Sequence, residues 1–309
     1  MANRFPNLYV PGASKSGTST LHELLNHHPE IKMSEIKEPH FWTHPDFNSF
    51  TKNEYNDYCA LFESDKDILY RGESSTGYMV FTSFIKRIKS HYDNDPKFIF
   101  LLRNPIDRCY SHYWWLKGIG SEKHIFRDAI LNDYRIEPTY EEHLPEGNFK
   151  NYFQFGLYGK WLSRFYSNFN PDSILIITFE ELKESQLDTL NKCFLFLGIG
   201  KMEFLPKSHD NKTVLLKYPL LYKYSKQLAF KKYNLPSRLK QNLPNGLKKF
   251  FRKDLMELVL KHTKTNATYP KITEDDRSFL KIHYYDDVKK LKQITGLKFN
   301  EWTDFKNQL

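Results

Sequence analysis

Small and hydroxyl-bearing residues near the N-terminus form a stretch that is suited to holding an anion. The run Gly12-Ala-Ser-Lys15-Ser16-Gly17-Thr18-Ser19 keeps most of the nucleotide-binding pattern GxxxxGK[ST]. Thr18 stands where that pattern has its lysine, and a lysine lies inside the loop instead, at Lys15. Glycines let backbone N–H groups close around an anion, and the N-terminus of a following helix adds positive potential. The stretch therefore predicts a phosphate or sulfate site, the alternative being an ordinary glycine-rich turn.

The displaced lysine argues against nucleoside triphosphate hydrolysis. The lysine that this loop lacks is the one that contacts the β- and γ-phosphates. The apolar run 98–102 also ends in Arg103, rather than in the aspartate that helps to hold Mg²⁺ in such enzymes. A P-loop kinase or NTPase is therefore disfavoured and is kept as an alternative.

A second group of chemically informative residues begins at Arg103. Asn104 is a good N-cap and Pro105 a good first helical residue, so a helix is expected to start here. Arg103 then lies at the carboxyl end of a strand, where open α/β sheets bind their ligands. Ser111 is seven residues past the cap and returns to the same helix face. An arginine and a serine that converge in this way suit the binding of one phosphate.

A third group occupies residues 37–42, with the sequence KEPHFW. Pro39 is expected to keep Glu38 out of a helix and near an extended conformation. A carboxylate between a lysine and a histidine, followed by two rings, suits a general base beside a sugar-binding floor. His40 and Trp42 are the candidate substrate residues. From these six residues alone, a solvent-exposed loop with an ordinary salt bridge is the better interpretation.

Strands alternate with helices over the first 200 residues, a pattern typical of α/β proteins. The expected strands are continuous apolar runs, as in a parallel sheet that is buried on both faces. They lie at 7–10, 68–70, 98–102 and 174–177, and the expected helices at 18–26, 55–62, 80–90, 105–117 and 158–165. After about residue 200 the strand signals stop, and helices are expected at 247–261 and 273–291. We expect one domain over 1–309, with an α/β core at 7–200 and a mainly helical, basic extension at 201–309.

The net charge of +9 is concentrated in one segment, residues 207–264, which holds 15 basic and three acidic residues. The segment predicts either an anionic partner or a set of solvated helix faces. Three cysteines that lie far apart argue against a disulfide scaffold or a zinc ribbon. No metal site is predicted, because His40 and His44 have no further ligand at a recognised spacing. The sequence has neither an apolar run long enough to span a bilayer nor a signal peptide, so a cytoplasmic location is expected, with a trimmed lumenal domain as the alternative.

These three groups, in this order and spacing, resemble the sulfotransferases that use 3′-phosphoadenosine 5′-phosphosulfate (PAPS). The resemblance is greatest to the heparan-sulfate-type carbohydrate branch and its bacterial relatives, and it extends from Asn7 to Trp302. It implies a P-loop-like phosphosulfate-binding loop, a 3′-phosphate pair of Arg103 and Ser111, and Glu38 as catalytic base with Lys15 as a second catalytic group. The loop residues are Lys15, Ser16, Gly17, Thr18, Ser19 and Thr20.

The activity implied by this resemblance is transfer of a sulfuryl group from PAPS to a hydroxyl or amine of an acceptor, most naturally a carbohydrate or glycoconjugate that can itself be anionic. Adenosine 3′,5′-bisphosphate is the other product. A sulfuryl group carries less charge than a phosphoryl group, so no metal is expected. Nucleic acid is not an expected partner, whereas the basic segment suits peripheral contact with a membrane. A polyanion-binding protein without catalysis and a family member that binds PAPS without transferring are two further interpretations.

Two departures from the heparan-type pattern leave the acceptor open. Ser74 stands where enzymes of the heparan 3-O type carry a lysine, after the glutamate equivalent to Glu73. Their late Lys-Gly-Arg loop has no clear counterpart, and residues 207–213 are a poor substitute. Of the tryptophans outside the three groups, the pair Trp114-Trp115 is expected in the core rather than against a sugar.

Overall fold

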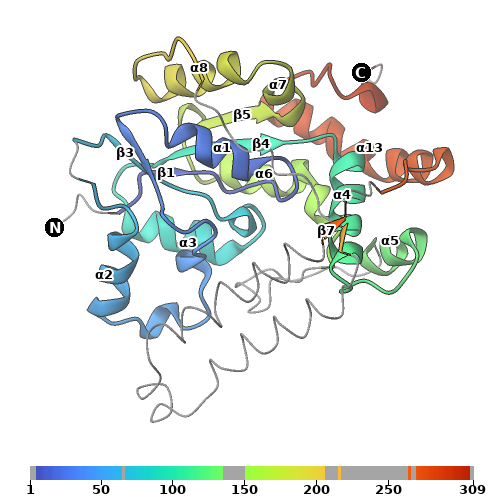
Figure 1. Cartoon of the computed structure of the whole chain (residues 1–309), viewed down its shortest axis with the longest axis horizontal. Helices are drawn as coiled ribbons and strands as arrows, with labels where there is room; N and C mark the ends of the chain where they lie inside the picture. Colours follow the sequence, from blue (N-terminus) through green and yellow to red (C-terminus); the bar gives the residue numbers. More distant parts are fainter. Residues whose placement is uncertain are drawn as a thin grey trace.

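A parallel five-stranded sheet, with strand order β2-β3-β1-β4-β5, forms the centre of the molecule (Figure 1). The computed structural model describes residues 5–64, 67–134, 150–205, 215–216, 264–265 and 269–306. The strands are β1 (Leu8–Tyr9), β2 (Ile31–Met33), β3 (Tyr70–Glu73), β4 (Lys97–Leu102) and β5 (Ile174–Thr178). The expected α/β fold with a central parallel sheet is confirmed. Strand β2 was not expected, and β3 runs to Glu73 rather than ending at Tyr70.

Helices cover both faces of this sheet. One face packs against α3 (Thr82–His91), α4 (Pro105–Gly118), α6 (Tyr158–Tyr166) and α13 (Glu274–Thr295), and the other against α1 (Thr18–Leu25), α7 (Phe179–Glu184) and α8 (Gln186–Leu197). In β4, Phe98, Phe100 and Leu102 face the first group of helices, whereas Ile99 and Leu101 face the second. Burial on both faces explains why this strand is a continuous apolar run in the sequence.

Short elements complete the described structure. Helices α2 (Lys52–Ala60) and α5 (Phe126–Tyr134) flank the first face, and β6 (Leu215–Leu216) pairs antiparallel with β7 (Lys264–Thr265). Single 3₁₀ turns are η2 (Phe41–Thr43), η3 (Phe47–Ser49), η4 (Thr76–Met79), η5 (Gln154–Gly156), η6 (Pro171–Ser173) and η9 (Thr303–Phe305). The expected helix at 247–261 and most of the basic segment 207–264 lie outside the described residues.

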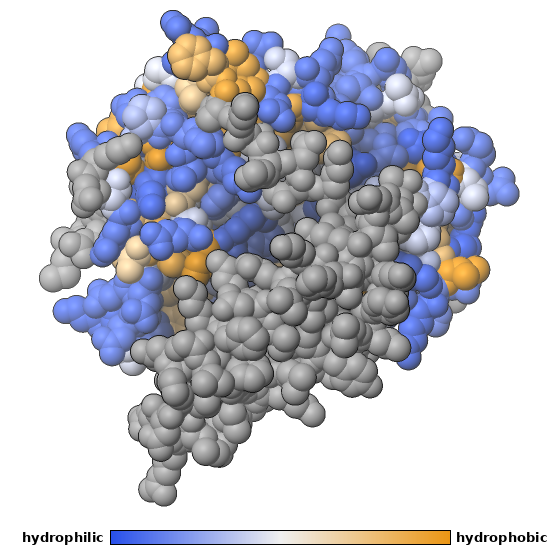
Figure 2. All heavy atoms as spheres, in the orientation of Figure 1, coloured by the Kyte–Doolittle hydropathy of each residue, from blue (hydrophilic) through white to orange (hydrophobic). Residues whose placement is uncertain are grey.

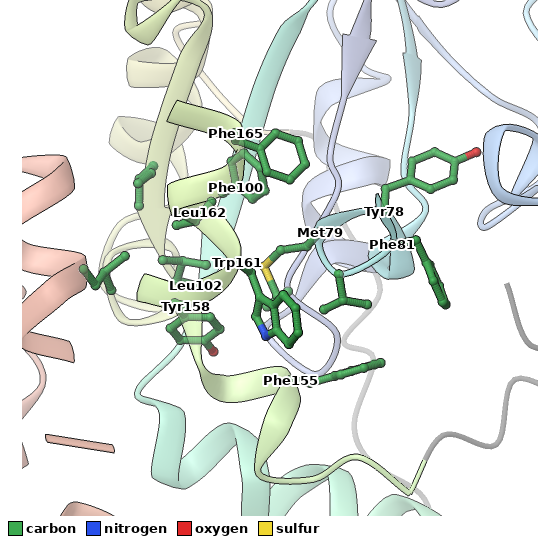
Figure 3. Close-up of a cluster of buried hydrophobic side chains, with 14 of the residues drawn as sticks. Tyr78, Met79, Phe81, Phe100, Leu102, Phe155, Tyr158, Trp161, Leu162 and Phe165 are labelled. Carbon is green, nitrogen blue, oxygen red and sulfur yellow. The ribbon is translucent and has the colours of Figure 1, made fainter. Parts of the chain in front are cut away.

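Aromatic side chains fill the larger core, between the sheet and α6 (Figure 3). Phe100 and Phe165 meet with their ring centroids 4.8 Å apart, and the indole N–H of Trp161 donates to the carbonyl of Gln154 at 2.7 Å. Full burial of one such side chain contributes about 1.5–3 kcal/mol relative to leaving it exposed. This core holds β4 and α6 rigidly beneath the sheet edge from which the candidate site is built.

Helix α13 begins after Thr273, as its acidic first turn predicts, and lies along α6. Thr273 caps the helix by accepting a hydrogen bond from the Asp276 N–H. In the described part of the chain, no helix is both long and apolar enough to cross a bilayer. The described surface in Figure 2 is mostly hydrophilic, with a hydrophobic area at the top of the view, over α8. That the whole chain forms one domain stays a prediction.

Candidate active site

The loops after β1 and β4 meet at the carboxyl edge of the sheet. After β1 the chain continues to β2, at one edge of the sheet, and after β4 it continues to β5, at the opposite edge. The neighbouring strands β1 and β4 therefore form a topological switch point, where open α/β sheets bind ligands. The Ala13 N–H donates to the carbonyl of Leu101 at 2.8 Å, and the Leu101 N–H to the carbonyl of Gly12 at 2.9 Å. The glycine-rich loop is therefore fixed against the end of β4.

The backbone of this loop leads into an N-terminus of α1 that no side chain caps. Gly17 has φ of 92° and precedes the helix, and no side chain caps the first turn. The first N–H groups of a helix have no partner within it, so they remain available to an anion. A β-carbon at Gly17 would lie 3.0 Å from the ring of Phe179, which favours glycine a second time. The expected strand, loop and helix are all present.

Lys15 interacts electrostatically with residues of both other groups, Arg103 of one and Lys37 and Glu38 of the other. Its Nζ lies 5.1 Å from the centre of the Trp115 ring. Burial lowers the pKa of Lys15 to about 8, helped by the positive charges of Arg103 and Lys37, whereas the negative charge of Glu38 opposes the shift. The three groups that are far apart in the sequence thus belong to one site.

Arg103 lies beside the loop, as its place at the end of β4 predicts. Its guanidinium donates to the carbonyl of Lys15 at 3.4 Å and lies 4.8 Å from the centre of the Phe179 ring. Ser111 lies about two turns into α4 and is buried. Within the described residues, no hydrogen bond joins Ser111 to Arg103. The two side chains can act together only through a ligand that touches both.

Residues of the C-terminal segment hold Asn104, the residue directly after Arg103. The N–H of Asn104 donates to Glu180 at 3.1 Å, and the Trp302 indole N–H donates to the other oxygen of the same carboxylate at 3.1 Å. The Asn104 side chain caps α4 and also donates to Asp304 at 2.7 Å. These contacts, across as many as 200 positions of sequence, could not be foreseen from the motif around Arg103.

Glu38 adopts a left-handed backbone conformation, with φ of 59°, and His40 does the same, with φ of 52°. The expectation of an extended conformation at Glu38 was therefore wrong. Pro39 disfavours the helical region for the residue before it and favours an extended one, but this local preference is overridden here. Tertiary contact overrides it, because the Glu38 N–H donates to the carbonyl of Ser74, just beyond β3, at 3.0 Å.

Three side chains hydrogen-bond the carboxylate of Glu38. Lys37 Nζ lies 2.8 Å from Oε1, the Thr76 hydroxyl donates to the same oxygen at 3.1 Å, and His40 Nε2 lies 3.2 Å from Oε2. Burial by itself raises the pKa of Glu38, but the His40 hydrogen bond and the Lys37 charge outweigh it and hold the pKa well below its usual range. Glu38 is thus an anion at neutral pH. Lys37 and His40 were expected beside it, whereas Thr76 was not.

Trp42 is completely buried, so its ring does not form the expected sugar-binding floor. The backbone N–H of Trp42 donates to the Tyr78 hydroxyl at 3.1 Å. The neighbouring Phe41 ring stacks on Tyr58, with the ring centroids 3.9 Å apart. The two rings after His40 are core residues that anchor the loop. Trp115, by contrast, is partly exposed and reaches Lys15, although the tryptophan pair was expected in the core.

A polar pocket of about 560 Å³ lies between α1 and β2, next to the Glu38 loop. Ser19, His22, Lys32 and Lys37 are among the residues that line it. His22 Nδ1 lies 2.9 Å from the hydroxyl of Ser74, the serine that stands where heparan 3-O-type enzymes carry a lysine. Burial, with the charge of Lys37, lowers the pKa of His22 to about 4, so this side chain is neutral at physiological pH.

Residues 6–257 match the protein family described as the sulfotransferase domain. The match takes in the glycine-rich loop, the Glu38 loop and the Arg103 strand end, and covers well over half of the chain. The chain belongs to the sulfotransferase domain family. This confirms the family inferred from the three residue groups.

Carbohydrate sulfotransferase 15 of Homo sapiens is 25% identical to this chain over 268 residues, which cover 69% of the chain and 46% of that protein. The chain thus spans about half the length of this relative. The sulfotransferase from Alicyclobacillus acidocaldarius, a solved structure, superposes with a TM-score of 0.67 at 22% identity. That superposition covers 97% of this chain and 99% of the other, and it confirms the fold.

The prediction of a cytoplasmic location is wrong. The membrane-associated sulfotransferase kil1 of Dictyostelium discoideum is 34% identical over 119 residues, which cover 36% of this chain and 24% of that protein. A related sequence thus occurs in a membrane-associated protein. The lack of a long apolar run in this chain therefore does not indicate a cytoplasmic location.

Proposed function

We propose that this sulfotransferase moves the sulfuryl group of PAPS to a hydroxyl or amine of a carbohydrate or glycoconjugate. One observation carries the proposal: an ionised carboxylate, Glu38, and a partly buried ammonium, Lys15, share one site beside the uncapped N-terminus of α1. The reaction needs a base for the acceptor and a cation for the departing phosphate, and this site supplies both. The name of the relative carbohydrate sulfotransferase 15 supports a sugar acceptor.

The residues present suit the donor. The uncapped first turn of α1 and the positive φ of Gly17 form a cradle for the 5′-phosphosulfate, in which Lys15, Ser16, Gly17, Thr18, Ser19 and Thr20 take part. Arg103, held against the loop by Phe179 and the Lys15 carbonyl, is proposed to bind the 3′-phosphate, with Ser111 as its partner on α4. Selection of PAPS over ATP then depends on Arg103, because ATP has no 3′-phosphate.

In the proposed step, the acceptor oxygen or nitrogen forms a bond to sulfur while the bond from sulfur to the 5′-phosphate oxygen breaks. Glu38 takes the acceptor proton, and Lys15 with the loop N–H groups meets the charge that grows on the leaving phosphate. The released product is adenosine 3′,5′-bisphosphate. Holding donor and acceptor in line supplies much of the remaining rate acceleration.

The acceptor is proposed to enter through the polar pocket between α1 and β2. Ser19 of the loop and Lys37, the neighbour of Glu38, both line this pocket, so it borders both halves of the site. Its lining carries two lysines, Lys32 and Lys37, and two glutamates, Glu23 and Glu35, so it suits a polar acceptor such as a sugar and does not by itself select a charged one. His40 contacts Glu38 and is proposed to lie at the acceptor hydroxyl, whereas Trp42 is too deep to do so.

The Glu38→Gln variant tests the proposal. With labelled PAPS and a library of glycans, the wild-type protein should add the mass of one sulfuryl group to an acceptor fraction, with EDTA present. Glu38→Gln should lower turnover by roughly 10²- to 10⁴-fold, as loss of a general base does, while calorimetry shows unchanged binding of adenosine 3′,5′-bisphosphate.

The exposed Glu184 of α7 offers a matched control, and Glu184→Gln should behave like the wild type. Unchanged turnover in Glu38→Gln would remove Glu38 from the role of base. Tight binding of magnesium-ATP with no binding of adenosine 3′,5′-bisphosphate would overturn the proposed function as a whole and favour a kinase-like enzyme.

A further inference from the structure

A second glutamate, Glu73, lies at the end of β3, completely buried, and takes no part in the proposed chemistry. Three hydroxyl groups hydrogen-bond its carboxylate. The Ser75 hydroxyl donates to Oε1 at 2.5 Å, and Tyr58 and Tyr78 donate as well. Burial raises the pKa of Glu73, and these hydrogen bonds oppose the rise. Hydrogen bonds from the three donors offset the cost of burying this carboxylate.

Two of these hydroxyls also hold the main chain of the loop that carries Glu38. The His40 N–H donates to the Ser75 hydroxyl at 3.1 Å, and the Trp42 N–H donates to the Tyr78 hydroxyl at 3.1 Å. Each hydroxyl has one proton. A hydroxyl that accepts a hydrogen bond from a backbone N–H can still donate that proton in a hydrogen bond to Glu73. The carboxylate thereby orients both hydroxyls toward the loop.

The loop needs such a support. Glu38 and His40 both have positive φ, a conformation that is unfavourable for residues other than glycine and that persists only where the surroundings impose it. The segment 74–76 supplies the constraint, since Ser74 accepts from the Glu38 N–H and Thr76 donates to the Glu38 carboxylate. Glu73 comes directly before this segment and anchors it to the core.

We infer that Glu73 is a positioning residue for the transfer reaction: through Ser75 and Tyr78 it holds residues 38–42 so that the Glu38 carboxylate faces the donor. This inference rests on the proposed role of Glu38 as base. Tyr58, the third partner, bonds the same carboxylate from α2 without a hydrogen bond to the 38–42 backbone among the described contacts. Its ring stacks on Phe41, and that contact survives removal of the hydroxyl.

Single-atom changes distinguish positioning from a merely structural role. Tyr78→Phe and Ser75→Ala each remove a hydroxyl that links Glu73 to the loop, whereas Tyr58→Phe removes one that does not. The first two, and Glu73→Gln, should lower kcat by up to about 10²-fold, the loss that a displacement of about 1 Å can cause. All should bind adenosine 3′,5′-bisphosphate as the wild type does, and Tyr58→Phe should keep its kcat.

A readout that does not need turnover is the ¹³C titration of the Glu38 carboxyl group by NMR, assigned with Glu38→Gln. In Ser75→Ala and Tyr78→Phe, the Glu38 pKa should rise toward its ordinary value, because the carboxylate moves away from His40 and Lys37. In Tyr58→Phe it should stay as in the wild type.

The outcomes separate the inference from the function on which it rests. A wild-type protein that transfers no sulfuryl group, yet shows these shifts in the Glu38 titration, would contradict the proposed function and keep Glu73 as the support of the loop. The inference is overturned if Ser75→Ala and Tyr78→Phe leave both kcat and the Glu38 pKa unchanged. It is equally overturned if all variants, Tyr58→Phe included, lose kcat in proportion to their loss of thermal stability.

Discussion

At the scale of single residues, the site keeps two opposite charges ready at neutral pH by different means. Glu38 is held ionised by Lys37 and His40, although burial favours its neutral form. Lys15 has only partial compensation, since Arg103 and Lys37 add positive charge around it. The lysine is therefore the group that titrates nearer to physiological pH.

The proposed function accordingly predicts an alkaline limit set by Lys15. As pH rises through about 8, the free enzyme loses the proton of Lys15 and with it the cation that receives the leaving phosphate, so kcat/KM should fall. Bound PAPS favours the protonated amine, so the limit in kcat should lie at higher pH. On the acid side, Glu38 should keep activity to a pH well below the usual range of a glutamate.

Initial rates measured from pH 5 to 10, at low and at saturating PAPS, check this prediction. Lys15→Arg provides the control, because a guanidinium does not lose its proton in this pH range. The variant should show no alkaline limit in kcat/KM, whatever its maximal rate. An alkaline limit that persists in Lys15→Arg would assign the titration to another group.

At the scale of elements, the site is made where a strand ends and a helix begins. The loop after β1 presents the N-terminus of α1, and the end of β4 presents Arg103, so two anions on one ligand can be bound at adjoining strand ends. Phe179, the first residue of α7, touches both, since it lies against Arg103 and leaves no room for a β-carbon at Gly17.

Replacing Arg103 with alanine should weaken PAPS binding but hardly affect adenosine 5′-phosphosulfate, which lacks the 3′-phosphate. A hydrogen bond to a charged group contributes about 1.5–3 kcal/mol, so the dissociation constant of adenosine 3′,5′-bisphosphate should rise by roughly 10- to 100-fold. Titration calorimetry with adenosine 3′,5′-bisphosphate and with adenosine 5′-phosphosulfate measures how much binding of each ligand is lost in the variant. An equal loss for both would show that Arg103 supports the loop rather than the 3′-phosphate.

At the scale of the whole molecule, the C-terminal helix α13 packs against the two helices next to Arg103, α4 and α6. Asp287 of α13 accepts the N–H groups of Gly159 and Lys160 at 2.8 and 2.7 Å and so caps the start of α6. Arg277 of the same helix pairs with Asp107 on α4 at 2.9 Å. Residues near the end of the chain thus hold the two helices that flank Arg103.

The close approach of α13 to α6 makes Gly159 sensitive to substitution. In Gly159→Ala the new β-carbon would lie 2.3 Å from the backbone oxygen of Asp287, so the two helices must separate. We expect a loss of about 1–3 kcal/mol in the free energy of unfolding, the usual cost of overpacking. Gly200→Ala is the matched control, because nothing lies within 4 Å of its β-carbon. Urea unfolding of both variants checks the prediction, and equal stabilities would contradict it.

Much of the architecture could be predicted because its signals are local. Helix α4 follows from Asn104 and Pro105, whose cap and fixed φ act on their nearest neighbours, and α1 follows from its leucine spacing. Helices α7 and α8 were not predicted, although Thr178 with Glu181 forms a capping box and Ser185 caps α8. These cap signals were present in the sequence. Strand β2 is only three residues long, too short for a periodic pattern to identify.

Which chemical groups are present, and which of them begin helices or end strands, follows from the order of residues alone, because those properties depend on neighbours along the chain. The sequence therefore predicted the loop, Arg103 and Glu38. Packing, by contrast, buries Trp42, brings Trp115 to Lys15 and turns the backbone of Glu38 left-handed. Each of these depends on contacts between residues tens of positions apart, and such contacts form only when strands and helices pack.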